Sequence, residues 1–251
     1  MSNPKPLVLV DLDDNLFQTA RKMTEAPIHV ASRTEAGEPS GYMTAAQKQF
    51  VAWLLNTADV IPVTARSIEA FSRVEIPFTG SAICSHGGVI LTPEGKPDDA
   101  WLARTSEVLR PYQEQLRNLS EQAILIGGEL GHSLRGWVVE ELGTGFYTVT
   151  KDNNSSESAL SELLAEMRKR GLIGNMYVHI NGNNLAFLPN ELNKKYAVQE
   201  IIRRDKEANG ERPVIGFGDS ISDLGFMSQC LFWGTPSNSQ ITRAIMEKVD
   251  D

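Results

Sequence analysis

The chain has 251 residues, 41% of them hydrophobic, and 32 acidic against 24 basic residues give it a formal net charge of −8. This size and apolar content suit one large globular domain or two modest ones. The acidic balance, without a run of five basic residues, argues against nucleic acids and anionic membranes as partners. The first apolar run is too short for a signal-peptide core or a membrane span, so we expect a soluble, cytoplasmic protein.

Residues 7–10 form an unbroken Val and Leu run that ends in the carboxylates of Asp11, Asp13 and Asp14. Such a run is typical of a strand buried on both faces of a parallel sheet. Open α/β sheets bind ligands at the carboxyl ends of these strands, and acids this close repel one another unless a cation compensates. The cluster therefore indicates a metal site, although taken alone an Asp-rich turn explains it equally well.

An EF-hand calcium loop is the sharper alternative, because Asp11, Asp13 and Asn15 match its first three ligand positions. Leu16 stands where that loop needs glycine, and Lys22 stands where it needs a bidentate glutamate. A strand rather than a helix also precedes the acids, so we reject the calcium loop.

Short apolar runs alternate with helical patterns in the first and last parts of the chain. The elements expected in the first part are a hairpin over 28–42, a helix over 44–56 that opens on a capping-box pattern, and strands at 60–63 and 82–84. Those expected in the last part are a helix over 193–208, a strand at 214–217, an apolar run at 230–233 and a helix over 239–249. This alternation predicts an α/β domain with a parallel sheet.

The middle of the chain has a different order, helix-strand-strand repeated once. Its expected elements are a helix over 99–119, strands at 137–140 and 146–150, a helix over 156–170, and strands at 176–180 and 185–188. Tight turn signals join both strand pairs. We therefore predict an α+β unit with an antiparallel sheet, inserted into the α/β domain.

Polar groups that suit phosphoryl transfer stand at several ends of the predicted elements. They are Asp11 and Asp13, Thr64, the lysine pair at 194 and 195, and Asp219 with Asp223. Each has an ordinary structural explanation as a cap, a turn or a solvated helix start. Together they supply a nucleophilic carboxylate, a second carboxylate able to protonate a leaving oxygen, donors for phosphoryl oxygens and ligands for Mg²⁺.

In this pattern the sequence resembles the haloacid-dehalogenase-like phosphohydrolases. Four motifs of that superfamily occur in order: Asp11-Leu-Asp13-Asp-Asn15, Thr64, Asn193-Lys194-Lys-Tyr-Ala197, and Gly218-Asp219-Ser-Ile-Ser-Asp223. The resemblance implies Asp11 as the nucleophile and Asp13 as the general acid and base. It also implies Thr64 and Lys194 as phosphoryl ligands, with Lys194 favoured over Lys195 on register. The implied Mg²⁺ ligands are Asp11, Asp13, Asp219 and Asp223.

The insertion resembles the type IIB cap of the sugar-phosphate phosphatases in that superfamily. The fold class we predict is a Rossmann-like parallel-sheet core, formed by residues 1–88 and 189–251, with an inserted αββαββ cap at 89–188 that sets substrate specificity. The sequence departs from the usual motifs at Asn15, Ala65, His86 and Lys195, and none of these changes removes a group that the chemistry requires.

The resemblance implies a Mg²⁺-dependent hydrolase of a small phosphate monoester, a sugar phosphate or phosphorylated sugar acid, in a monomer or homodimer. A phosphotransferase or phosphomutase, a receiver-like signalling domain and a non-catalytic phospho-ligand-binding protein remain alternatives. Arg66 and His86 are candidate substrate ligands, with a salt bridge and a packed role equally open. In the cap the candidates are Arg135, Trp137, Lys151, Asn181 and Asn183, for which we favour solvated loop or turn roles.

Overall fold

A computed structural model of the chain describes residues 5–180 and 182–249. The chain forms two compact units. The first consists of Met1–Leu102 and Asn193–Asp251, and the second of Ala103–Leu192. The first boundary lies beyond the predicted 88/89, because the strand at Val89–Leu91 pairs with a strand of the first unit, and the second lies at 192/193 where 188/189 was predicted.

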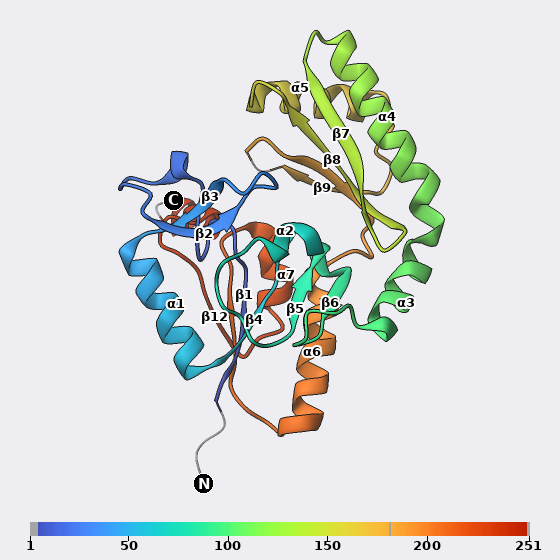
Figure 1. Ribbon diagram of the computed structural model, residues 1–251. Coiled ribbons are helices and arrows are strands. Elements are labelled where there is room, and N and C mark those ends of the chain that lie inside the picture. The colour runs from blue at the N-terminus through green and yellow to red at the C-terminus, as the bar shows by residue number, and fades with distance from the viewer. Residues whose placement is uncertain (1–4, 181, 250–251) are drawn as a thin grey trace. The chain divides into compact units, whose positions relative to one another are not determined.

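The first unit is built on a four-stranded sheet in the order β12-β11-β1-β4 (Figure 1). Its strands are β1 (Leu7–Val10), β4 (Asp59–Pro62), β11 (Val214–Phe217) and β12 (Phe232–Gly234). All three neighbouring pairs are parallel. Their carboxyl ends therefore lie at one edge, which is where the predicted site residues follow the strands.

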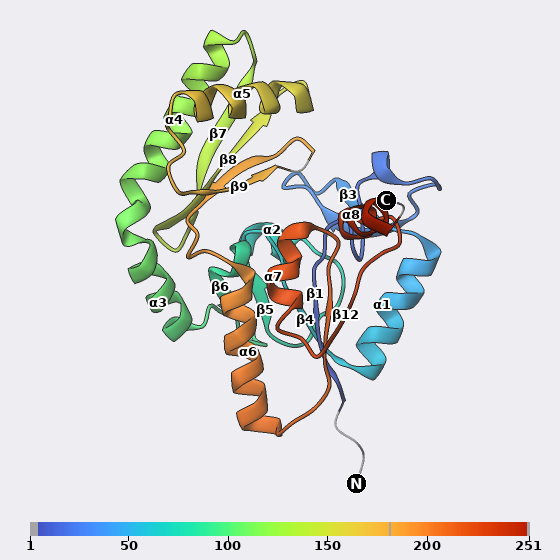
Figure 2. The ribbon, with the colours of Figure 1, turned by 180° about the vertical axis from the view of Figure 1, so that it is seen from behind.

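Helices cover both faces of this sheet (Figures 1 and 2), which explains the unbroken apolar run in β1. Leu7 and Leu9 pack in a cluster with α6 (Lys194–Asn209) and α7 (Leu224–Met227). Val8 and Val10 alternate to the other face and pack with α1 (Ala45–Thr57). Alternate side chains of a strand point to opposite faces, so a strand between two helical layers must be apolar at every position.

Smaller elements complete the first unit. They are a hairpin of β2 (His29–Arg33) and β3 (Pro39–Met43), a second hairpin of β5 (Ala82–Cys84) and β6 (Val89–Leu91), helices α2 (Ile68–Ser72) and α8 (Gln240–Val249), and short 3-10 turns at Ala20–Lys22, Ser85–Gly87 and Ile221–Asp223. Thr44 caps α1 with the expected capping box. A bridge from Val63 to Ile83 joins the end of β4 to β5.

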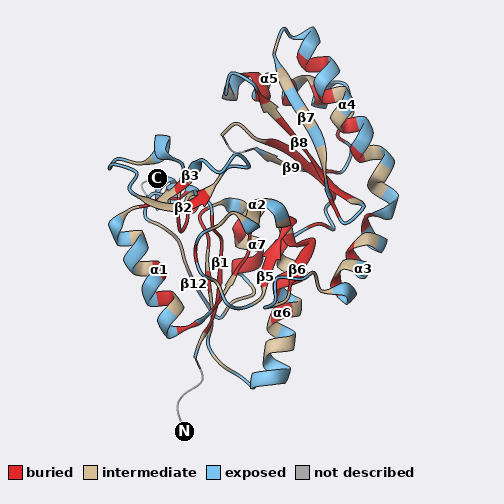
Figure 3. Cartoon of the chain, viewed as in Figure 1, coloured by how far each residue is buried: buried red, intermediate tan, exposed pale blue. Residues whose placement is uncertain are grey.

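The second unit is an antiparallel sheet in the order β7-β8-β10-β9 with helices packed on it. Its strands are β7 (Leu134–Glu141), β8 (Thr144–Asp152), β9 (Tyr177–Ile180) and β10 (Leu185–Leu188). The helices α4 (Gln113–Glu129) and α5 (Glu157–Lys169) pack against the sheet through apolar side chains, and the helix residues that face away from it are largely exposed (Figure 3). The order matches the predicted αββαββ pattern, and the predicted fold class is confirmed for both units.

One predicted helix differs in its bounds. The expected helix over 99–119 is divided into α3 (Asp99–Leu109), a 3-10 turn at Arg110–Tyr112, and α4, which continues to Glu129. Pro111 lacks the amide hydrogen that a continuous helix needs at that position. Helix α4 continues through Gly127. A Cβ at this position would collide with the side chain of Leu134 in β7, so the glycine permits close packing of the helix on the strand. Within the described residues, no helix combines the length and apolar character that crossing a bilayer requires.

Candidate active site

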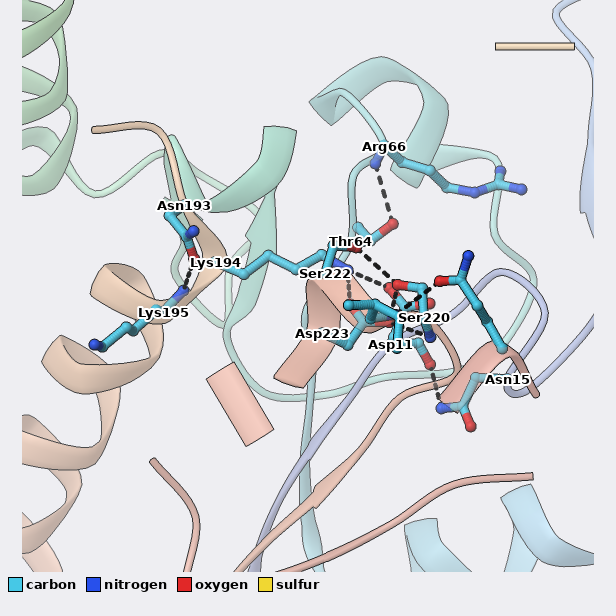
Figure 4. Close-up of polar contacts among 12 residues, drawn as sticks. Asp11, Asn15, Thr64, Arg66, Asn193, Lys194, Lys195, Ser220, Ser222 and Asp223 are labelled. Atoms are coloured by element: carbon cyan, nitrogen blue, oxygen red, sulfur yellow. Dashed lines mark hydrogen bonds and ion pairs between the residues drawn. The ribbon is translucent and has the colours of Figure 1, made fainter. Parts of the chain in front are cut away.

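The centre of the site is a buried contact between Lys194 and two carboxylates (Figure 4). The Lys194 ammonium donates to Oδ1 of Asp11 at 2.6 Å and to Oδ1 of Asp223 at 2.7 Å. Asp11 comes directly after β1, and its amide donates to the carbonyl of Phe217 at 2.8 Å, at the end of β11. Lys194 is 183 residues from Asp11 in the sequence, so the fold alone brings these groups together.

Lys194 reaches the carboxylates because of how α6 begins. Asn193 caps the helix by accepting the Lys195 amide at 2.9 Å, and the Lys195 side chain points away from the cluster (Figure 4). The backbone of Gly87 lies against this helix start, where a Cβ would be 2.6 Å from the carbonyl oxygen of Asn193. Gly87 also has a φ of +95°, so glycine is required here on two grounds.

Asp219 and Asp223 follow the neighbouring strand β11. Asp223 accepts hydrogen bonds at Oδ2 from the Ser220 hydroxyl at 2.7 Å and the Ser220 amide at 3.1 Å. This is the capping box of the 3-10 turn at Ile221–Asp223. One oxygen each of Asp11, Asp219 and Asp223 lies within 4.8 Å of the others, and all three residues are buried.

Burial governs the electrostatics of this cluster. Burial, with smaller contributions from Asp223 and Asp14, raises the pKa of Asp219 to about 7. Burial also raises the pKa of Asp11, against the opposing effect of Lys194. For Lys194, burial opposes the charge, but Asp11 and Asp223 outweigh it and raise the pKa of the ammonium.

These charges fit a divalent cation. Within the described part of the chain, the cluster sets three carboxylates against the ammonium of Lys194, so two negative charges lack compensation. Burial first, and then the neighbouring carboxylates, raise the pKa values of Asp11 and Asp219, and Lys194 does not cancel these effects. Mg²⁺ takes hard carboxylate oxygens as protein ligands, usually one or two of them, with water and phosphate oxygens filling its remaining positions.

Asp13 lies outside this cluster and is paired with Arg66. Nε of Arg66 donates to Oδ2 of Asp13 at 2.8 Å, and Nη2 donates to Oδ1 at 2.7 Å. Thr64 is fully buried just after β4. Its amide donates to the carbonyl of Ile83, and its hydroxyl oxygen accepts the Arg66 amide at 3.1 Å. The carboxylate of Asp13 is thus held by a guanidinium, and its predicted role as a metal ligand stays a prediction.

Comparison with solved structures identifies the fold. The sucrose-phosphatase of Synechocystis sp., solved with sucrose and phosphate, has a TM-score of 0.53 at 14% identity over 98% of this chain and 97% of its own. The C-terminal domain of C. albicans trehalose-6-phosphate phosphatase has a TM-score of 0.58 at 12% identity, over 89% and 73%. A haloacid dehalogenase-like hydrolase from Bacteroides thetaiotaomicron has a TM-score of 0.51 at 12% identity, over 97% and 99%.

The chain has the haloacid-dehalogenase-like fold. The resemblance inferred from the sequence motifs is therefore confirmed at the level of the fold. No protein-family model matches the chain, and no curated protein matches it in sequence.

Two residues of the first acidic segment have structural contacts within this haloacid-dehalogenase-like fold. Asp14 adopts a left-handed conformation with φ +62°, and its carboxylate pairs with Lys22 at 2.5 Å. Asn15, one of the departures from the usual motif, is buried and donates from Nδ2 to the carbonyl of Asp11 at 2.9 Å. Asn15 therefore fixes the backbone that carries the proposed nucleophile.

The other candidate substrate ligands lie in two places. His86 follows β5 with φ +56°, and its amide donates to the carbonyl of Thr64 at 3.2 Å. In the second unit Lys151 lies over the ring of Trp137, 5.9 Å from its centroid, and Arg135 donates to Asn153. The side chain of Asn183 accepts from the backbone amide of Asp152 at Oδ1 and donates from Nδ2 to the backbone carbonyl of Asp152. Asn181 lies outside the described residues.

Sequence reasoning missed Ser220 as a member of the site. Its hydroxyl and amide both donate to Asp223. Burial opposes the charge of Asp223, but Lys194 and, after it, Ser220 lower the pKa of that carboxyl. The spacing Ser220-x-x-Asp223 is a capping-box pattern and is visible in the sequence. From the motif alone, this segment was predicted only as a turn that supplies metal ligands.

Proposed function

We propose that this protein is a Mg²⁺-dependent phosphatase that hydrolyses a small phosphate monoester through an aspartyl-phosphate intermediate. The observation that carries the proposal is the buried contact of Lys194 with Asp11 and Asp223 at 2.6 and 2.7 Å, beside Asp219. A purely structural cluster would not gain from three buried carboxylates around one ammonium, because unpaired buried charge is strongly destabilising. Binding a cation and a phosphoryl group explains this arrangement.

In the first step, a carboxylate oxygen of Asp11 attacks phosphorus and the bond from phosphorus to the ester oxygen breaks. The carboxyl of Asp13 donates its proton to the leaving alkoxide, which departs as the alcohol. In the second step, water attacks phosphorus and gives a proton to Asp13, and the bond to Asp11 breaks to release inorganic phosphate. Lys194 and Thr64 hold the phosphoryl oxygens during both steps.

Asp11 and Asp219 would be the main ligands of Mg²⁺, which would supply positive charge against the phosphoryl oxygens when bound. Lys194 already compensates part of the carboxylate charge. We infer that Asp223, held by Ser220 and Lys194, serves as a further ligand or orients one.

A sugar phosphate or phosphorylated sugar acid is the substrate class we propose. Supporting this class, the fold neighbours include a sucrose-phosphatase with bound sucrose and phosphate and a trehalose-6-phosphate phosphatase domain. The second unit, Ala103–Leu192, would then set specificity as a cap. Its Trp137 and Lys151 are a pair of aromatic and cationic groups suited to a sugar ring and an anion. A cytoplasmic location and a monomeric or homodimeric state belong to the same proposal.

Release of inorganic phosphate from a panel of sugar phosphates, with Mg²⁺ or with EDTA, tests the proposal. We expect Mg²⁺-dependent release with at least one ester, and loss of that release in Asp11→Asn. Release that survives Asp11→Asn would overturn the mechanism. Transfer to an added sugar without free phosphate would instead indicate a phosphotransferase, and binding of esters without turnover would indicate a non-catalytic protein.

Adjacent lysines in α6 provide a matched pair of variants. Lys194→Met should lower kcat/KM by about 100-fold or more, because it removes a charged donor from the reacting phosphoryl group. Lys195→Met should leave kcat/KM within about twofold, since its side chain points away from the carboxylates (Figure 4). Equal losses in the two variants would contradict the role given to Lys194.

A further inference from the structure

The contact between Arg66 and Asp13 is the most specific ion pair near the proposed site that the mechanism does not explain. Both carboxylate oxygens of Asp13 accept from the same guanidinium, at 2.7 and 2.8 Å. The Asp13 side chain is 49% exposed, whereas that of Arg66 is only 19% exposed. An exposed carboxylate is thus held by a mostly buried partner through two parallel hydrogen bonds, the geometry that fixes a carboxylate plane best.

Arg66 is itself held from several sides. Its guanidinium carbon lies 5.1 Å from the ring centroid of the fully buried Phe17. Nη1 donates to the carbonyl of Ala70 in α2 at 3.4 Å, and Nη2 approaches Oγ of Ser32 in β2 at 3.5 Å. Its carbonyl accepts the amide of Ser85 at 2.7 Å. Elements far apart in the sequence therefore fix one guanidinium, a degree of restraint that an exposed salt bridge does not need.

We propose that Arg66 is a positioning residue that orients the carboxyl group of Asp13 for proton transfer to the leaving alcohol. This inference rests on the proposed phosphatase function. The two contacts with Arg66 occupy one side of each carboxylate oxygen, and the exposed side of Asp13 remains open to an ester oxygen. Lysine can take this role only in part, because its ammonium cannot bind both oxygens in a fixed plane.

This role differs from that of a substrate ligand in how activity depends on the leaving group. An ester of an alcohol leaves as a strongly basic alkoxide and needs a correctly placed proton donor, whereas 4-nitrophenolate leaves almost without one. A group that acts through Asp13 should therefore matter for the first ester and hardly for the second. A group that binds the phosphoryl moiety directly should matter equally for both.

The experiment compares kcat/KM for glycerol 2-phosphate and 4-nitrophenyl phosphate in Arg66→Met and Arg66→Lys with Mg²⁺ present. The ratio kcat/KM reports the steps up to alcohol release, so it excludes the later hydrolysis of the intermediate. For Arg66→Met we expect a loss of about 100-fold with glycerol 2-phosphate and less than about threefold with 4-nitrophenyl phosphate. Arg66→Lys should fall between wild type and Arg66→Met, and inhibition by inorganic phosphate should not change.

A double-mutant cycle makes the test specific to Asp13. In an Asp13→Asn background, Arg66→Met should cause no further loss with glycerol 2-phosphate, because the group that it orients is gone. Arg33→Met is the matched control: it removes another guanidinium that is paired with a carboxylate, Glu75 at 2.5 Å, and should leave both esters unaffected. Urea midpoints of all variants report whether folding is retained.

Equal losses with both esters, weaker inhibition by inorganic phosphate, or additive losses in the Asp13→Asn background would overturn the inference. The first two results would make Arg66 a substrate ligand, the role considered for it from the sequence. Failure of the proposed function is a distinct result, because the wild-type protein would then hydrolyse neither ester.

Discussion

Replacing Asp219 by Asn should stabilise the metal-free protein at pH 8. Burial, with help from Asp223 and Asp14, raises the pKa of Asp219 from its ordinary value of 3.8 to about 7. Between these values the folded protein binds a proton that the unfolded chain does not bind. The free energy of unfolding therefore falls as pH rises from about 4 to 7, and the full penalty is present above pH 7. The neutral amide of the variant carries no charge and escapes the penalty.

The size of the effect follows from the shift. The difference between 3.8 and about 7 is roughly three pKa units, and each unit corresponds to about 1.4 kcal/mol. The upper bound is therefore about 4 kcal/mol, and relaxation around the charge lowers the expected gain to about 1–3 kcal/mol. Below about pH 4 the carboxyl is protonated in both states, so wild type and Asp219→Asn should then differ little.

Urea unfolding of wild type and Asp219→Asn in EDTA, at pH 5 and pH 8, measures this difference. Asp205→Asn is the matched control, for which we expect a change of opposite sign in the free energy of unfolding. Burial opposes the charge of Asp205, but Arg212 and Asn209 outweigh it and lower the pKa, so its removal should destabilise the protein at pH 8. Adding Mg²⁺ should raise the urea midpoint of wild type and affect Asp219→Asn much less, because one ligand is missing.

A destabilised Asp219→Asn variant at pH 8 in EDTA would refute the reasoning. It would mean that the charge of Asp219 is already compensated in the folded protein and that the carboxylate cluster has no deficit for a cation to fill. If Asp219→Asn is more stable than wild type in EDTA but Mg²⁺ does not stabilise wild type, only the assignment of the cluster as a metal site is refuted.

Three further outcomes are expected. Gly87→Ala should cost about 2–4 kcal/mol in urea unfolding and lower the proposed phosphatase activity, because a Cβ would meet the backbone at the start of α6 and φ is +95°. Gly95→Ala, with φ +76° but nothing within 4 Å, should cost only about 1 kcal/mol and leave activity intact. Ser220→Ala should destabilise by about 1–3 kcal/mol, because it removes a 2.7 Å hydrogen bond to a buried carboxylate. Burial raises the pKa of Cys230 to about 12, so a thiol reagent at pH 8 should label it far faster in urea than in the native protein.

The fold was largely predictable because burial leaves a strong pattern in sequence. The apolar run of β1 and the repeated helix-strand-strand order predicted both sheets. The rule that strand ends share one edge of a parallel sheet accounts for Asp11, Thr64 and Asp219, whereas Lys194 was assigned to the site from the motif resemblance. The predicted helix bounds were wrong around Pro111 and Gly127. The break at Pro111 is a local effect of proline that the helical pattern did not take into account, whereas the close approach of Leu134 to Gly127 depends on tertiary packing.

The pairing of Asp13 with Arg66 could not be predicted from sequence. Its geometry depends on Phe17, Ser32 and Ala70, which reach the guanidinium from a loop, a hairpin strand and a short helix. Periodicity gives no register for such short irregular segments. Residues that fix a site through three separate elements leave no local pattern, which is why Arg66 was considered only as a substrate ligand or a surface salt bridge.

The insertion of one unit within the other has a consequence for folding during synthesis. The second unit is continuous over Ala103–Leu192, so all its strands have been made before Lys194 leaves the ribosome. The main sheet has to wait longer, since β1 pairs with β11, whose strand begins at Val214. A nascent chain would therefore carry Asp11, the proposed nucleophile, without the lysine that compensates it until Lys194 has been made, and the proposed activity would require these later segments.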